Sequence, residues 1–233
     1  MPAPDESIPF PTIPSWQHAQ RGARSATSAD TAALADRIRA ADRIHIVGGP
    51  GVGKSSFARA IAAATGVRLW HLDEIAFEGP EFEPRPESET HQEAVAIAEE
   101  ARWVTEGIFV GWVEPLFERA DVIVWLDHLR WSAAVRRIST RWLRQAIREP
   151  ASRRGRERFF RFDDYARHTR QLVQVVVTSR EYWNGGDSPR RYAVTREQVR
   201  TALERHRDKV FRLTTADEAE AVLRLVGRSS AAG

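Results

Sequence analysis

The sequence predicts an α/β fold in three layers, in which a five-stranded, mostly parallel sheet lies between two layers of helices. Short apolar runs typical of strands alternate along the chain with longer runs typical of helices, and this order favours a parallel sheet. The first of these apolar runs leads directly into a glycine-rich loop that opens an Ala-rich helix. With 233 residues, of which 42% are hydrophobic, the chain is long enough to bury one sizeable core.

The predicted strands are short segments rich in Val, Ile and Leu that are bounded by loop or turn residues. Their alternation with helices places the carboxyl ends of successive parallel strands along one edge of the sheet, where ligands bind in open sheets of this kind. The strands are expected at residues 43–47, 67–72, 102–105, 121–126 and 210–213.

Helices are predicted between the strands, and two of them carry a capping-box signature, in Thr195 with Gln198 and in Thr215 with Glu218. Three prolines interrupt the segment 75–86, which is therefore predicted as a loop. The helices are expected at residues 28–41, 54–65, 87–101, 113–119, 131–147, 163–182, 195–206 and 215–226, with further loops at 148–162 and 184–189.

The two ends of the chain are predicted to lie outside the folded domain, which should span residues 28–226. Residues 1–27 are rich in proline and read as a flexible tail, and residues 227–233 read as a disordered C-terminal tail. The N-terminus lacks the basic start and apolar core of a secretory signal, and the longest apolar runs are too short to cross a membrane. There are no cysteines, which excludes disulfides, thiolate metal sites and thiol nucleophiles. A cytoplasmic location without membrane partners is expected.

The glycine-rich loop is the most informative segment, because it fits the phosphate-binding pattern G-x-x-x-x-G-K-[ST] at every fixed position. In such a loop, glycines let successive backbone N–H groups point at one phosphate chain, and the helix that follows adds its partial positive charge. Lys54 is expected to reach the β- and γ-phosphates of ATP, and the Ser55 hydroxyl to hold Mg²⁺. The chain has 33 arginines but only 2 lysines, so a lysine at the one position that requires it is hard to ascribe to chance. The predicted fold is therefore of the P-loop NTPase type, with these nucleotide-binding residues: Gly48, Gly49, Pro50, Gly51, Val52, Gly53, Lys54, Ser55 and Ser56.

Carboxylates follow three of the predicted strands. Glu106 is the first candidate for holding a metal-bound water and Asp127 the second, since Mg²⁺ takes few protein ligands beside nucleotide phosphates. Asp73 is a candidate catalytic residue that would take the proton of an acceptor hydroxyl, or else orient a base or a sugar. Each of the three is alternatively a helix cap or turn former. His71 is expected to point to the other face of its strand.

The segment 130–170 holds 13 arginines against 4 carboxylates, a concentration that calls for an anionic partner. One interpretation is a lid, at about residues 141–170, that closes over ATP and excludes water. The other is a nucleic-acid surface in which the aromatic residues Phe159, Phe160, Phe162 and Tyr165 stack on bases. The lid is favoured because the segment follows the fourth strand; Arg136 is then a candidate catalytic residue and Arg137 a nucleotide-binding one.

These residues resemble the adenylate kinase-related P-loop kinases, and most closely the small proteins labelled DNA topology modulation or adenylate-kinase-like proteins. The resemblance covers about residues 43–226. It is carried by the glycine-rich loop Gly48–Ser55, called the phosphate loop below, and by three further segments. These are His71-Leu72-Asp73, Trp103-Val104-Thr105-Glu106-Gly107 and Ala120–Trp131.

The resemblance implies a five-stranded parallel sheet, ATP-dependent phosphorylation and a role for Arg136 on the lid or the nucleotide. The chain departs from the family in having Glu106-Gly107 where Asp-Gly is common. It also has Val110 where nucleoside monophosphate kinases carry an arginine that grips the acceptor phosphate. A hydroxylated small molecule that is bound through Asp73 is therefore an alternative to a nucleotide acceptor.

The leading hypothesis is a Mg-ATP-dependent kinase that phosphorylates a small molecule or nucleotide and acts as a monomer or dimer. One alternative is a P-loop ATPase or nucleotide-binding regulator without a small-molecule acceptor. The other is a nucleic-acid-binding protein that uses the arginine-rich segment. The sequence leaves open the acceptor, the base of the donor nucleotide and the oligomeric state.

Overall fold

The structure is a computed structural model that describes residues 28–79, 83–148, 180–183 and 194–230. The predicted N-terminal tail, most of the predicted lid and residues 163–179 of a predicted helix lie outside these ranges, as do the four aromatic residues proposed for base stacking.

A five-stranded sheet forms the middle of the described chain, as predicted. Every neighbouring pair in it is parallel. The strand that leads into the phosphate loop, β1, occupies the central position and pairs with β5 on one side and β6 on the other. The order across the sheet is β2 (Leu69–His71), β5 (Trp103–Gly107), β1 (Arg43–Gly48), β6 (Val122–Leu126) and β7 (Val210–Leu213).

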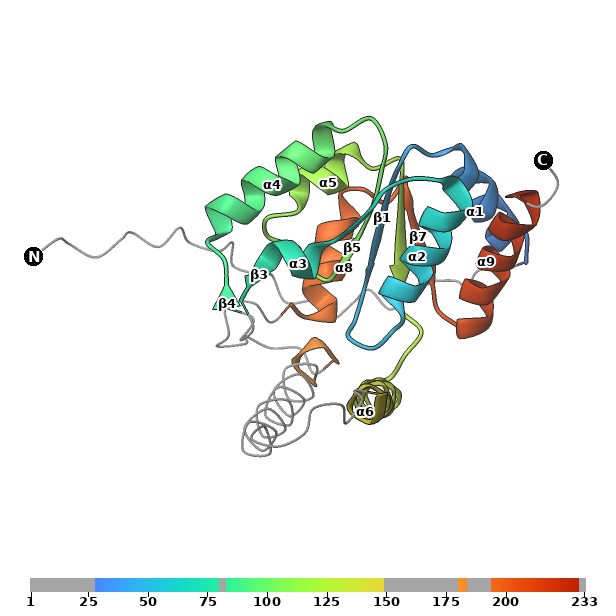
Figure 1. The fold of residues 1–233 in the computed structure, drawn as a ribbon. Coiled ribbons are helices and arrows are strands. Elements are labelled where there is room, and N and C mark those ends of the chain that lie inside the picture. The colour runs from blue at the N-terminus through green and yellow to red at the C-terminus, as the bar shows by residue number, and fades with distance from the viewer. Residues whose placement is uncertain (1–27, 80–82, 149–179, 184–193, 231–233) are drawn as a thin grey trace, which may run out of the picture.

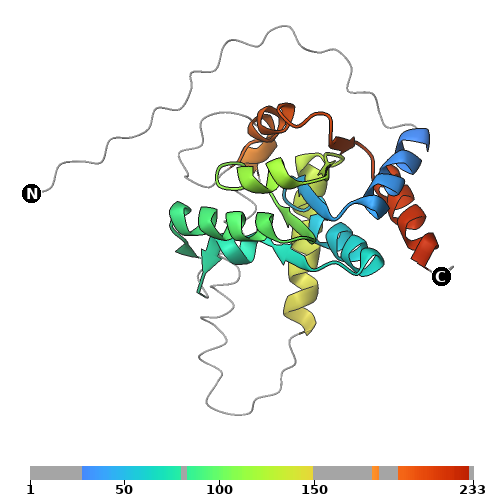
Figure 2. The same ribbon diagram turned by 90° about the horizontal axis from the view of Figure 1, so that it is seen from above.

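Helices cover both faces of the sheet and complete the predicted three layers (Figures 1 and 2). Alternate strand residues supply two separate cores: Ile44 and Ile46 of β1 belong to one, and Val47 belongs to the other. The first core packs against α1 (Ser28–Ala40), α2 (Lys54–Thr65) and α9 (Ala216–Ser230). The second packs against α4 (Glu87–Glu99), α5 (Glu114–Arg119) and α8 (Arg196–Glu204).

The carboxyl ends of the parallel strands meet at one edge of the sheet, and helix α6 (Trp131–Arg148) lies beyond that edge (Figure 1). The phosphate loop leaves β1 at the same edge. An ideal Cβ on Gly51 would lie 3.1 Å from the carbonyl oxygen of Ala134 and 3.1 Å from Cγ1 of Ile138, so α6 is packed directly against the loop.

Both predicted capping boxes are present. Thr195 Oγ1 accepts from the backbone N–H of Gln198, whose side chain accepts in turn from the N–H of Thr195. The same reciprocal pair joins Thr215 and Glu218 at the start of α9. Helix α9 continues to Ser230, beyond the expected end near residue 226, so part of the expected C-terminal tail is helical.

The segment after β2 differs from the prediction. The strand was expected to reach residue 72, but it ends at His71 and a short helix, α3 (Leu72–Ala76), begins at once. The predicted loop 75–86 also contains an antiparallel pair, β3 (Phe77–Glu78) and β4 (Glu83–Pro84). The burial of Leu72, Ile75 and Ala76 explains the helix, because spacings of three and four residues put them on one helical face.

No helix in the described ranges is long and apolar enough to cross a membrane.

Candidate active site

The phosphate loop has the backbone geometry that its sequence predicts. Gly51 and Gly53 have positive φ angles of 71° and 102°, in the left-handed region that favours glycine. The carbonyl oxygen of Gly53 then accepts from the N–H groups of Ser56 and Phe57, which closes the first turn of α2. Gly48 has no room for a side chain, since an added Cβ would lie 2.4 Å from the carbonyl oxygen of Leu126. The loop therefore turns tightly between the central strand and the N-terminus of α2.

The Lys54 side chain folds back over this loop. Its Nζ donates to the carbonyl oxygen of Gly49 at 3.2 Å, which places the ammonium group above the turn made by the glycines. Ser55 and Ser56 follow in the first turn of α2, where Ser55 is half-buried and Ser56 is exposed. Backbone N–H groups, a helix N-terminus and an ammonium group thus meet at one place, the combination that binds a phosphate chain.

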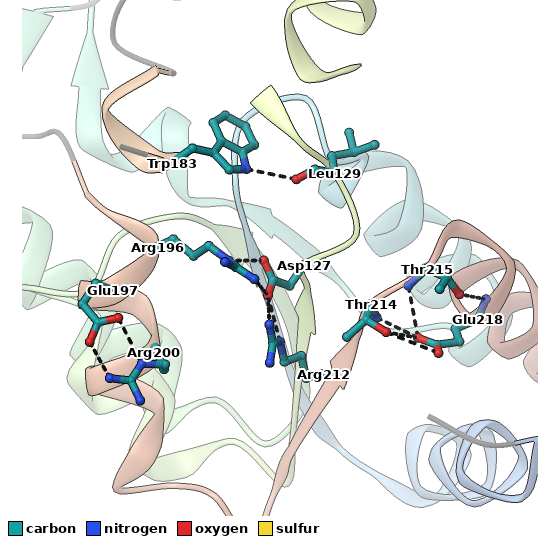
Figure 3. A network of polar contacts seen from close by, with 10 residues as sticks. All are labelled: Asp127, Leu129, Trp183, Arg196, Glu197, Arg200, Arg212, Thr214, Thr215 and Glu218. Atoms are coloured by element: carbon teal, nitrogen blue, oxygen red, sulfur yellow. Dashed lines mark hydrogen bonds and ion pairs between the residues drawn. The ribbon is translucent and has the colours of Figure 1, made fainter. Parts of the chain in front are cut away.

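One aromatic side chain covers the loop from a distant part of the chain. Tyr182 is buried against Gly49, where an added Cβ would lie 2.6 Å from the tyrosine ring. Burial raises the pKa of Tyr182 to about 12. Its neighbour Trp183 is anchored in turn, because its Nε1–H donates to the carbonyl oxygen of Leu129 at 3.0 Å (Figure 3). No local pattern in the sequence indicates that this segment contacts the phosphate loop.

Glu106 lies within β5 and is 3% exposed. Its Oε1 accepts from Nδ1–H of His71 at 2.7 Å. The two residues are register partners in the parallel pair of β2 and β5, and Glu106 is also the register partner of Ile46. Because Val104 and Ile46 belong to the core beneath α2, the side chain of Glu106 projects toward the helix that carries Lys54 and Ser55. The expectation that His71 points away from the site is wrong, since its ring is bonded to Glu106.

Asp73 lies in the first turn of α3 and not at the end of a strand, and it is exposed. The helix that carries it starts close to the phosphate loop. Leu72 packs on Gly107, where an added Cβ would lie 2.9 Å from Cβ of the leucine, and Gly107 is the register partner of Val47 in β1. The candidate proton acceptor therefore sits beside the edge of the sheet from which the loop emerges.

Asp127 follows β6 and is held by two arginines from distant elements (Figure 3). Arg196 of α8 donates to both carboxylate oxygens at 2.7 Å, and Arg212 of β7 donates through Nε to Oδ2 at 2.8 Å. The Asp127 side chain is 3% exposed. Its predicted role as a metal ligand stays a prediction, and both of its oxygens are already engaged by guanidinium groups that join β6, β7 and α8.

Arg136 and Arg137 are both exposed on α6, the helix whose Ala134 and Ile138 pack on the loop. The guanidinium of Arg137 acts on His128: burial, and secondarily the positive charge of Arg137, lower the pKa of that histidine. Arg137 thus lies near the end of β6 at the loop edge of the sheet.

The residues around the loop fit a magnesium ion that is held mainly by a nucleotide. Among the described residues, no group of three or more His, Cys, Asp or Glu side chains could form a metal cage. Mg²⁺ keeps several waters and takes one or two protein ligands in nucleotide sites, so a hydroxyl and one carboxylate suffice. Ser55 at the start of α2 and Glu106 on the adjoining strand face supply that donor set.

A hollow lies beside Ala76 of α3, between the start of α4, the segment that follows β5 and Val194, which precedes α8. It is small, with a volume of about 80 Å³, well below that of a typical small-molecule pocket. The residues that line it are Ala76, Arg85, Glu87, Thr90, Phe109, Val110, Gly111, Trp112 and Val194.

The described residues thus place a loop with the P-loop pattern at the carboxyl end of the central strand of a parallel, five-stranded sheet. No protein-family model matches the chain, and no curated protein sequence matches it significantly. Solved structures of similar arrangement include a gluconokinase from Sinorhizobium meliloti 1021, at 17% identity and a TM-score of 0.41, covering 82% of this chain and 94% of that chain. A shikimate kinase from Bacteroides thetaiotaomicron is 13% identical with a TM-score of 0.38, covering 81% and 98%. A shikimate kinase from Acinetobacter baumannii, in complex with shikimate, is 15% identical with a TM-score of 0.34, covering 75% and 98%. At such low sequence identities and TM-scores, these structures say nothing about the activity or the substrate of this chain.

Proposed function

We propose that the protein is an ATP-dependent kinase that transfers the γ-phosphoryl group of Mg-ATP to a hydroxyl group of a small molecule. The observation that carries the proposal is the phosphate loop. Its two left-handed glycines, the start of α2 and the Lys54 ammonium converge at the carboxyl end of the central strand. A carboxylate, Glu106, projects from the neighbouring strand on the same face as α2.

The loop would position the donor. Its backbone N–H groups and the N-terminus of α2 bind the phosphates, and Lys54 exchanges its contact with Gly49 O for phosphate oxygens. A magnesium ion bound with the nucleotide would neutralise negative charge on its phosphates. The Ser55 hydroxyl would hold the ion directly, and Glu106 would hold one of its waters, with His71 fixing the carboxylate.

Asp73 would act on the acceptor. In the transfer, the acceptor oxygen bonds to the γ-phosphorus while the bond from that phosphorus to the β–γ bridging oxygen breaks. The hydroxyl proton passes to the Asp73 carboxylate, and ADP is the leaving group. Arg136 and Arg137, on the helix beyond the loop, would stabilise negative charge on the donor. The resemblance to adenylate kinase-related kinases supports this role of the arginines on the donor nucleotide.

The direct test compares the two lysines of the chain. Lys54→Ala should abolish both Mg-ATP binding in calorimetry and transfer of labelled γ-phosphate, with the fold intact by circular dichroism. The matched control is Lys209→Ala, since Lys209 donates to the carbonyl oxygen of Glu118 ahead of β7, at the opposite edge of the sheet. Absence of ATP binding in the unmodified protein, or full transfer by Lys54→Ala, would contradict the proposal. Hydrolysis of ATP that no added acceptor accelerates would favour the ATPase alternative.

A further inference from the structure

The contact between Tyr182 and the phosphate loop bears on how the loop is held in place, on the premise that the protein is the kinase proposed above. Gly49 occupies a variable position of the pattern G-x-x-x-x-G-K-[ST], so the pattern itself does not require glycine there. The backbone does not require it either, because Gly49 lies outside the left-handed region that Gly51 and Gly53 adopt. Something else in the structure therefore restricts this position to glycine.

The restriction comes from the ring of Tyr182. The three atoms nearest to an added Cβ on Gly49 all belong to this ring: Cε1 at 2.6 Å, Cδ1 at 2.8 Å and Cζ at 3.2 Å. Because Cβ atoms in proteins essentially never come within 3.0 Å of another heavy atom, even alanine would collide with the ring. Tyr182 is 2% exposed and Gly49 is also buried, and a packed interior leaves little room for either to move.

The segment that carries this ring is anchored by residues before and after it in the chain. Nε1–H of Trp183 donates to the carbonyl oxygen of Leu129 at 3.0 Å (Figure 3). The guanidinium of Arg180 lies 5.6 Å from the centroid of the Trp131 ring, in a cation–π contact. Leu129 lies between β6 and α6, and Trp131 is the first residue of α6, the helix that also packs on the phosphate loop. The ring is therefore fixed relative to that helix.

Gly49 is also the residue that holds the ammonium group of the loop. Its carbonyl oxygen accepts from Lys54 Nζ at 3.2 Å and from the N–H of Val52 at 3.4 Å. The Tyr182 ring and the Lys54 ammonium thus contact the same residue, the ring on the side of its Cα and the ammonium at its carbonyl oxygen. A shift of Gly49 away from the ring would move the oxygen to which Lys54 is bonded.

The other end of Tyr182 lies near the end of β6. Burial raises the pKa of Tyr182, and Trp125 of β6 acts on it next, followed by the charges of Asp127, Arg196 and Arg212. Among the described residues, the buried hydroxyl has no hydrogen bond of normal geometry. The ring is therefore packed between the phosphate loop and this cluster of charges, and its packing does not depend on a bond from the hydroxyl.

We propose that Tyr182 is a positioning residue for the nucleotide site. Its ring is the surface against which Gly49 is held, and this contact fixes the carbonyl oxygen that keeps Lys54 over the loop before ATP binds. Tyr182 acts through the loop and not by touching the reacting atoms. Position 49 is glycine in this chain because that ring fills the space of a side chain.

A double-mutant cycle tests this role, with the unmodified chain, Gly49→Ala, Tyr182→Val and the double variant. Calorimetry gives the dissociation constant of Mg-ATP without an acceptor, and urea unfolding gives the stability of each protein. We expect Gly49→Ala to raise the dissociation constant about tenfold, as overpacking of this kind typically costs. Tyr182→Val should raise it by a similar factor of about ten, because the loop must then be ordered when the nucleotide binds.

The decisive value is the cost of Gly49→Ala when the ring is absent. Valine ends at its γ carbons, whereas the three ring atoms that face Gly49 lie beyond Cγ. In the Tyr182→Val background, the added methyl group should therefore raise the dissociation constant by about twofold or less. If Tyr182→Val does not fold, Tyr182→Leu, which keeps more of the buried volume, replaces it in the cycle.

Two controls separate positioning from a general loss of structure. Tyr182→Phe keeps the ring and should bind Mg-ATP as the unmodified protein does. Gly227→Ala is the matched glycine control, since Gly227 is an exposed residue of α9 where an added Cβ meets nothing within 4 Å, and it should also bind normally.

The same cost of Gly49→Ala in both backgrounds would overturn the proposal. It would also be overturned if Tyr182→Val lost stability but bound Mg-ATP as tightly as the unmodified protein, or if Tyr182→Phe bound as weakly as Tyr182→Val. These outcomes concern Tyr182 alone. Absence of Mg-ATP binding in the unmodified protein would instead contradict the kinase proposal, and this one with it.

Discussion

Nδ1 of His71 lies 2.7 Å from Oε1 of Glu106, across the parallel pair of β2 and β5. The glutamate side chain is 4% exposed and that of the histidine 27%, so the bond is largely shielded from water. One carboxylate oxygen is thereby fixed, while the carboxylate as a whole projects toward α2. This relationship makes His71 a positioning residue for the carboxylate proposed to hold a magnesium-bound water.

His71→Ala should weaken the use of magnesium without removing the nucleotide site. We expect the Mg²⁺ concentration for half-maximal transfer to rise about tenfold, because loss of a partner that orients a metal-site ligand typically costs that much. Affinity for ATP without magnesium should not change, because Lys54 and the loop are intact. A magnesium titration of initial rates and calorimetry of ATP with and without the ion measure the two effects.

A second substitution at the same position distinguishes a positioning role of His71 from a purely structural one. His71→Asn places an amide N–H near the position of Nδ1 and should restore most of the magnesium response. If His71→Ala loses stability and activity together while the magnesium requirement is unchanged, the pair has only a structural role.

We expect Asp127 to contribute more to the stability of the folded protein than to the binding of magnesium. Its buried carboxylate neutralises Arg196 and Arg212, which come from α8 and β7 (Figure 3). Asp127→Asn leaves these two guanidinium groups without their counter-ion. Loss of one member of a buried ion pair is strongly destabilising, and we expect about 2–4 kcal/mol here because the arginines are partly exposed.

Urea unfolding measures that loss, and Asp121→Asn is a useful comparison. Asp121 is exposed at the opposite edge of the sheet, where its carboxylate accepts from two backbone N–H groups, those of Asp42 and Arg43. A magnesium requirement that rises in Asp127→Asn with little loss of stability would instead support Asp127 as a metal ligand.

His45 should make the folded protein sensitive to mild acid. This residue of β1 is fully buried, with its ring bonded to Thr105 Oγ1 at 2.8 Å, and burial lowers its pKa to about 3. Between the ordinary histidine pKa of 6.5 and about 3, the unfolded chain binds a proton at this site that the folded protein does not. The contribution of His45 to the free energy of unfolding is therefore fully present above pH 6.5 and falls by up to about 1.4 kcal/mol for each pH unit below it.

Unfolding free energies of the unmodified protein and of His45→Gln, measured from pH 4.5 to 8, check this prediction. The difference between the two curves should shrink or reverse as the pH falls, because glutamine does not titrate. Parallel curves over that range would show that His45 does not set the acid sensitivity.

Several features of the fold could be read from the sequence because they depend on short-range chemistry. The strand that leads into Gly48 is predicted by its local apolar pattern. The loop after it is predicted because its glycines adopt backbone conformations that other residues rarely adopt. The caps at Thr195 and Thr215 also involve residues only three positions apart. The helix that starts at Leu72 was missed, although the spacing of its buried residues was a usable signal.

The candidate site was predictable only in part. Lys54 and Ser55 are predicted as site residues because the motif carries them in one continuous segment, and their roles stay predictions. The bond between His71 and Glu106 was not predicted, because it depends on a pairing register between strands that are 35 residues apart.

By itself, the sequence determined the strands of the main sheet, most of the helices, their order and the glycine-rich loop with the phosphate-binding pattern, since each is encoded within a few neighbouring residues. Only the tertiary structure decided which side chains meet. It placed β5 between β2 and β1, which brings Glu106 to His71. It also brought together β6, β7 and α8, so that Asp127 meets two arginines that lie 69 and 85 residues further along the chain. Such contacts arise from strand order and long-range packing, which no local pattern specifies.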